Sequence, residues 1–88
     1  MAESCDVVAR VVSQQGSCAA GHKVGDEWVI GEKTPEGICL FAFSSLLPAA
    51  MVLSFGGSFP WEDDPDKTTI ACPDATNPLV IELRRVPK

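Results

Sequence analysis

The chain has 88 residues, an apolar fraction of 45% and a net charge of −5. So short a chain predicts a single domain over 1–88, with a thin core that a metal, a cross-link or a partner subunit would strengthen. Twelve acidic residues stand against seven basic ones, and the basic ones are scattered along the chain. Nucleic acids and anionic membranes require clustered Lys and Arg, so neither is expected as a partner.

The start of the chain and the cysteines indicate the compartment. The first residues, MAESCD, are acidic where a secretory signal would be basic. The longest apolar stretch, 38–55, is interrupted by Ser and Pro and is too short to span a bilayer. We therefore expect a soluble, cytoplasmic protein. Its four cysteines would stay reduced, as metal ligands, catalytic thiols or buried apolar residues.

The first half of the chain carries two strand patterns. CDVVARVV at 5–12 is rich in β-branched residues and places its odd-numbered residues, from Cys5 to Val11, on one face. Gly and Asp residues between 16 and 26 predict a turn-rich connection. EWVI at 27–30 is a second short strand, and Gly and Pro over 31–37 predict the loop that follows it.

The second half begins with a helical period. Apolar residues recur at helical spacing from Phe43 to Met51, and Pro48 predicts a kink, so we expect a helix over 38–46 and a second helical segment to about 54. TTIA at 68–71 and LVIELRRV at 79–86 are strands separated by a turn over 72–78. The order predicts an α+β fold, with a small antiparallel or mixed sheet of about four strands packed on one kinked central helix.

Cys18 and His22 form the first candidate site. Three residues separate them in a glycine-containing turn. This C-x₃-H spacing can supply half of a tetrahedral zinc or iron site. Cys39, at the expected start of the helix, and Cys72, before the last strand, would complete it. The expected metal ligands are therefore Cys18, His22, Cys39 and Cys72, and the expected cofactor is zinc or iron.

The same residues allow two other interpretations. In a stand-alone enzyme, Cys18 or Cys72 would be the nucleophile, His22 the base and Asp74 the orienting group, in acyl, thioester-type or other small-molecule chemistry. Alternatively the cysteines are core residues, Asp74 is a turn residue, and the protein is a structural interaction module. The acidic run over 62–66 lacks the alternating spacing of a calcium loop and predicts a solvated loop.

Three motifs together carry a resemblance to a known family. They are GHKVGDE over 21–27, PEGIC over 35–39 and CPDATNP over 72–78, accompanied by Gly56-Gly57 and Pro60-Trp61. With these, the chain resembles a family of short, uncharacterised bacterial and archaeal proteins from about residue 7 to 85. The resemblance implies that Cys18, His22, Cys39 and Cys72 belong to the family pattern and that Cys5 does not. The sequence departs from the pattern at Trp28, where Phe is expected.

The leading hypothesis from these residues is a metal- or thiol-centred accessory or binding module. Its partner would be a small molecule or another protein, and a homo-oligomer is a further expectation. Every functional interpretation requires the four side chains of Cys18, His22, Cys39 and Cys72 to converge. Because turns at strand ends gather at one edge of a small sheet, we expect at least three of the four within ~8 Å of one another.

Overall fold

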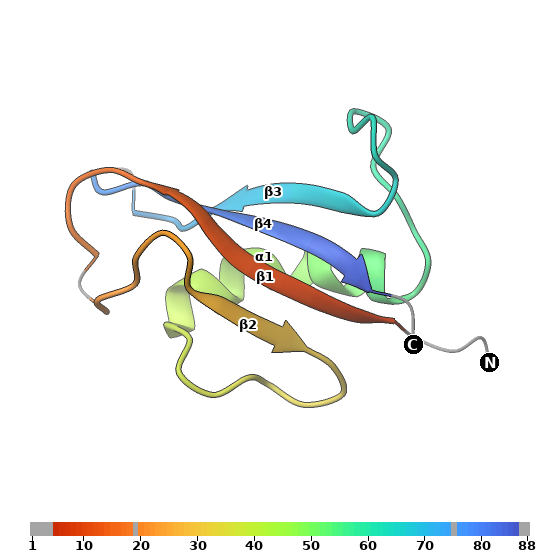
Figure 1. Ribbon diagram of the computed structural model, residues 1–88, viewed down its shortest axis with the longest axis horizontal. Helices are drawn as coiled ribbons and strands as arrows, with labels where there is room; N and C mark the ends of the chain where they lie inside the picture. The colour runs from red at the N-terminus through yellow and green to blue at the C-terminus, as the bar shows by residue number, and fades with distance from the viewer. Residues whose placement is uncertain (1–4, 19, 75, 87–88) are drawn as a thin grey trace.

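The computed structural model describes residues 5–18, 20–74 and 76–86. Within these ranges the elements are β1 (Asp6–Gln14), β2 (Glu27–Ile30), α1 (Leu40–Ser54), β3 (Lys67–Ala71) and β4 (Leu79–Val86). The helix lies across one face of the sheet (Figure 1). All three strand pairings are antiparallel, so the expected α+β fold is confirmed. Residues 1–4, at the acidic start of the chain, lie outside the described ranges.

The sheet has the order β2-β1-β4-β3, so its central pair joins β1 and β4. These strands pair from Asp6 with Val86 to Gln14 with Leu79, with one register shift before Ser13. The edge strands β2 and β3 have only four and five residues. Short edges leave little unpaired backbone to which another chain could add a strand.

The core lies between α1 and the sheet face that it covers. The alternation predicted for β1 is confirmed, because Val7, Ala9 and Val11 are fully buried. Trp28 and Phe43 are partly buried against the edge of the core. The remaining buried apolar residues come from β2, α1 and β4 and are Ile30, Ala42, Leu46, Ala49, Ala50, Leu53, Leu79, Ile81 and Leu83.

The helix differs from its sequence-based expectation at both Pro48 and its start. The structure has one helix over Leu40–Ser54 where two segments were expected, with Pro48 inside it. Pro48 lies on the exposed side of α1, where its ring does not disturb the core and where water can reach the carbonyl of Ser44 that loses its helical partner. The helix begins two residues later than expected because Cys39 is extended, with φ −60° and ψ 136°.

At the carboxyl end of α1, Arg85 joins three segments of the chain. Its guanidinium donates to the carbonyls of Leu53 and Gly57 at 3.0 and 2.8 Å, and to the carbonyl of Pro65 at 2.9 Å. It also makes two bonds to the Asp66 carboxylate, at 2.8 and 3.2 Å. The side chain of Arg85 is only 11% exposed. The acidic loop over 62–66 is therefore anchored to the helix end by this arginine.

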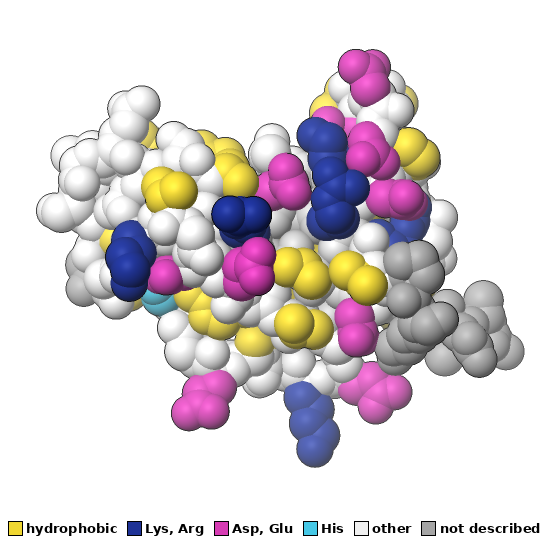
Figure 2. Space-filling view, in the orientation of Figure 1, with side chains coloured by type: hydrophobic (Ala, Val, Ile, Leu, Met, Phe, Trp, Pro, Cys, Tyr) yellow, Lys and Arg dark blue, Asp and Glu magenta, His cyan; other side chains and the backbone are white. Residues whose placement is uncertain are grey.

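The sheet face opposite α1 carries charges of both signs (Figure 2). Arg10 lies 3.8 Å from Glu27 across β1 and β2. Arg84 lies 3.1 Å from Asp64 and 3.6 Å from Glu82. The hydrogen bond from the Asp66 backbone N–H, with a smaller contribution from that of Arg84, holds the pKa of the Asp64 carboxyl below its ordinary value, although partial desolvation opposes them. This face therefore combines paired charges with exposed apolar side chains, among them Val12, Val29 and Val86.

Candidate functional site

A cavity of about 410 Å³ lies at the amino-terminal end of α1. Three chain segments form its walls: the turn after β1, the start of the helix, and the turn before β4. Its lining is mainly apolar and contains three of the four cysteines. The lining residues are Cys18, Ala20, Cys39, Phe41, Cys72, Pro73, Asp74, Asn77 and Leu79.

The turn that carries Cys18 is fixed to the end of β1. With its amide oriented so that both atoms are satisfied, Gln14 accepts from the N–H of Cys18 and donates to the carbonyl of His22, each at 2.7 Å. The N–H of Gly21 donates to the carbonyl of Cys18 at 2.9 Å, and Gly21 has φ 81°, a conformation that Gly adopts without strain. The strand end therefore sets the position of the Cys18 thiol.

The His22 side chain is hydrogen-bonded to the backbone of Cys39. Its Nε2 accepts a 2.9 Å hydrogen bond from the Cys39 N–H, and its ring meets the Trp28 ring edge-on at 4.8 Å between centroids. The side chain is buried, with 8% exposure. Because Nε2 is the acceptor, a neutral imidazole in this arrangement carries its proton on Nδ1. His22 thus joins the first turn to the start of α1, and its Nε2 lone pair is occupied by a backbone donor.

Cys39 is the N-cap residue of α1. Its thiol makes no capping hydrogen bond to the helix, and the residue both lines the cavity and packs, partly buried, against the core. Serine or aspartate at this position would accept from the first turn of the helix, which a thiol does poorly. The thiol of Cys39 is therefore left available to whatever occupies the cavity.

The pKa of the Cys72 thiol is raised above its ordinary value. Burial is the main cause that raises the pKa of the Cys72 thiol, and the backbone N–H of Asp74 partly opposes it. Negative charge on Cys39, Cys18 and Asp74 raises the pKa of Cys72 further. The three cysteines are free thiols, as is Cys5. The sulfur of Cys72 therefore favours its protonated form.

The turn before β4 closes the cavity wall through Asn77. The Asp74 carboxylate accepts from the backbone N–H groups of Thr76 and Asn77 at 3.1 and 3.2 Å, and from the Asn77 amide at 3.2 Å. Asn77 Oδ1 in turn accepts from the N–H of Ser17 at 3.0 Å. Gly16, at φ 70°, lets the two turns approach, since a Cβ there would collide with the Asn77 amide. Asp74 is thus a turn-forming residue at the rim of the cavity.

The structure brings Cys18, Cys39 and Cys72 to one cavity and places His22 beside it, behind the backbone of Cys39. Asp74 lines the cavity, but its carboxylate accepts from Thr76 and Asn77 within its own turn, whereas the orienting role would need it to bind His22. Across residues 5–18, 20–74 and 76–86, no three His, Cys, Asp or Glu side chains are arranged as a metal-ligand group. The four-ligand metal site therefore stays a prediction.

Sequence reasoning missed several residues of this site. Phe41 and Leu79 supply apolar lining, and Asn77 links two of the walls. The Asn77-Pro78 step gave a signal, but it indicated only a turn. Phe41 gave no signal, because an apolar residue in an apolar helix is expected in the core, whereas this side chain is 68% exposed.

Comparison of the chain with protein-family models, with curated proteins and with solved structures yields no match. The resemblance described from the sequence motifs thus remains a prediction. In the described part of the chain, no helix has the length and hydropathy to cross a membrane.

Proposed function

We infer that this protein is a thiol-centred binding module that holds a thiophilic ligand in the cavity at the amino-terminal end of α1. The observation that carries the proposal is that Cys18, Cys39 and Cys72, from three separate segments, line one cavity as free thiols. Sulfur donors prefer soft partners, which include zinc, iron and organic electrophiles. The apolar lining favours a ligand whose remainder is small and weakly polar.

A binding role fits these contacts better than a cysteine nucleophile activated by His22. A thiol nucleophile needs a lowered pKa or an adjacent base, but burial raises the pKa of Cys72. The Nε2 of His22 already accepts from the Cys39 N–H. His22 therefore supports the proposal as a positioning residue, because it fixes the backbone from which the Cys39 thiol projects.

Zinc and iron are the metals that the cysteines and histidine suggest, and the cavity supplies three sulfur donors for either. Cys18 and Cys72 lie on turns, so a bound metal would draw these two turns toward the start of α1. Metal coordination also requires deprotonated thiols, so metal binding would release protons and would weaken at low pH. An organic ligand with one thiophilic group would need less rearrangement of the turns.

The test uses anaerobically prepared full-length protein and three probes: Zn²⁺, Fe²⁺ and phenylarsine oxide, which bridges two nearby thiols with loss of water. Native mass spectrometry counts bound equivalents for the parent protein and for Cys18→Ser, Cys39→Ser and Cys72→Ser. Cys5→Ser is the matched control, because Cys5 is also a free thiol but does not line the cavity.

We expect at least one probe to bind with one equivalent per chain, to persist in Cys5→Ser and to be lost in at least two of the cavity variants. Binding of Zn²⁺ or Fe²⁺ with a rise in melting temperature identifies a metal as the ligand class. Binding of the arsenical alone identifies an organic thiophilic ligand. If none of the three binds, or if binding survives in every cavity variant, the proposal is overturned.

A further inference from the structure

The solvent-facing side of α1 is an apolar stripe along the whole helix. With successive residues about 100° apart around the helix axis, the exposed residues fall within an arc of roughly 120°. The opposite side holds the buried residues. The stripe consists of Leu40, Phe41, Ser44, Pro48, Met51, Val52 and Phe55. Its single polar member is Ser44, whose hydroxyl donates a 2.8 Å hydrogen bond to the carbonyl of Phe41.

No charged residue occurs anywhere in α1, whose sequence is LFAFSSLLPAAMVLS. A surface helix packed on one face only normally carries charges on the other. The exposed face of the sheet, by comparison, mixes apolar side chains with paired Arg, Glu and Asp side chains (Figure 2). The absence of charge on the stripe therefore indicates a surface that is covered rather than solvated.

We propose that the stripe is covered by the same stripe of a second copy of this chain, in an antiparallel two-fold helix pair centred on Pro48. Two pairs of stripe residues are symmetric about that centre, while Leu40 and Met51 have their mirror positions at Gly56 and Ser45, outside the stripe. Phe41 and Phe55 lie seven residues to either side, and Ser44 and Val52 lie four residues to either side. A two-fold axis at Pro48 thus sets each Phe41 against Phe55 of the second copy, and each small Ser44 against Val52.

The area of the stripe matches what a dimer needs. The exposed fractions of its five large apolar members run from 38% for Val52 to 74% for Leu40. With roughly 150–250 Å² for each large side chain, they leave about 440–730 Å² of apolar surface per chain. If all of it were covered, two copies would bury roughly 900–1,500 Å², which spans the about 1,000 Å² that a biological interface needs. A lipid surface is the less suitable occupant, because the stripe has no Lys or Arg to meet headgroups.

The dimer would also affect the thiol cavity. Phe41 belongs both to the stripe and to the cavity lining. Packing of Phe55 from the second copy on Phe41 would place an aromatic ring beside the mouth of the cavity. The helix pairing itself does not depend on the proposed function, since it rests on residues of α1 that mostly lie outside the cavity.

The experiment measures oligomeric state by sedimentation equilibrium for the parent chain and three variants. Val52→Glu would bury an unpaired carboxylate twice in the dimer, and we expect it to weaken the dimer by about 100-fold. Val29→Glu is the matched control, because Val29 is 57% exposed on β2, away from the stripe. We expect Val29→Glu to dimerise like the parent chain. Circular dichroism checks that each variant is folded.

The double variant Ser44→Lys with Val52→Glu tests the two-fold arrangement. Within one chain these side chains lie about 12 Å apart along the helix and do not pair, but across the proposed axis each Lys faces a Glu. The double variant should therefore recover at least about 10-fold of the lost affinity. A monomeric parent chain overturns the proposal, as does a dimer unaffected by Val52→Glu. Sedimentation of a monomeric parent with phosphatidylcholine vesicles would assign the stripe to lipid instead.

Discussion

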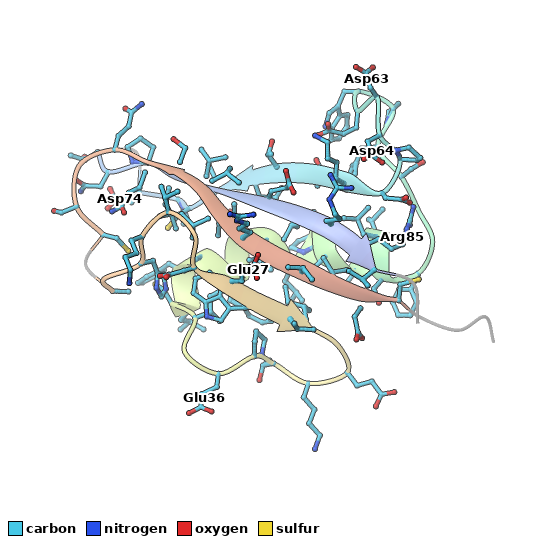
Figure 3. The ribbon with its side chains drawn as sticks, viewed as in Figure 1. Glu27, Glu36, Asp63, Asp64, Asp74 and Arg85 are labelled. Carbon is cyan, nitrogen blue, oxygen red and sulfur yellow. The ribbon has the colours of Figure 1, made fainter. Side chains whose placement is uncertain are left out.

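The two ends of α1 are held by different kinds of contact, and Figure 3 shows Arg85 near the carboxyl end. At the carboxyl end, Arg85 makes five hydrogen bonds to four residues, two of them to a carboxylate. Toward the amino end, neutral bonds hold the helix, from the Cys39 N–H to His22 at 2.9 Å and from the Ser45 hydroxyl to the Ala71 carbonyl at 2.6 Å, beside a cavity of about 410 Å³. Charge-assisted bonds are roughly twice as strong as neutral ones. The molecule therefore pairs a rigid end with an end that can adapt to a ligand.

Among variants that test this difference, Arg85→Ala should have the largest effect on stability. Removal of the guanidinium leaves the Asp66 carboxylate and three carbonyls without their partner, so we expect the free energy of unfolding to fall by about 3 kcal/mol. Urea denaturation measures the change. Arg84→Ala is the matched control: its pairs with Asp64 and Glu82 are solvent-exposed, so its loss should be about 0.5 kcal/mol. Equal losses in the two variants would remove the distinction between the ends.

At the other end, His22→Ala should have an intermediate effect. It leaves the Cys39 N–H without an acceptor and removes the ring contact with Trp28, so we expect a loss of about 2 kcal/mol. Amide hydrogen exchange at Cys39 should accelerate in His22→Ala, because its N–H has lost its acceptor. A general loss of stability would instead accelerate exchange throughout the domain. Lys23→Ala, at an exposed neighbouring position, should change stability by less than about 0.5 kcal/mol. Unchanged exchange at Cys39 would contradict the capping role of His22.

The smallest expected effect is a shift in the reactivity of Cys72. Because burial raises its pKa above the ordinary value of a thiol, alkylation by iodoacetamide should have its midpoint at a higher pH than for a free thiol. A raised thiol pKa favours the protonated folded form, so its contribution to stability is present below the unfolded pKa and is lost as the pH rises through the folded one. Cys39→Ser should lower the midpoint, because one repelling charge is removed. A midpoint below that of the unfolded chain would contradict this account.

Much of the fold could be predicted from local patterns. The alternation of Val7, Ala9 and Val11 identified the buried face of β1, and the predicted last strand coincides with β4 over Leu79–Val86. The helix was less predictable, since Pro48 usually interrupts a helix. Whether Pro48 interrupts the helix depends on which side of the helix faces the core, and that is decided by tertiary packing. The exposure of the apolar stripe could not be predicted from the sequence for the same reason.

The candidate site was predictable in its residue types but not in its contacts. Cysteines at 18, 39 and 72 were identified from the sequence, and the structure places all three in one cavity. The role of His22 as an acceptor for the Cys39 N–H was not visible, because it depends on the distance between two loops. The same holds for Asp74, whose carboxylate is used within its own turn.

The pairing of β1 with β4 has a consequence for how the chain folds. The two central strands come from opposite ends of the described chain, yet they pair along their length. Their first contact must close a loop that contains both edge strands and the helix, and the loss of chain entropy precedes any gain from the sheet. Such topologies fold in milliseconds to seconds rather than microseconds. During synthesis the edge of β1 that pairs with β4 would therefore have no partner until β4 has left the ribosome.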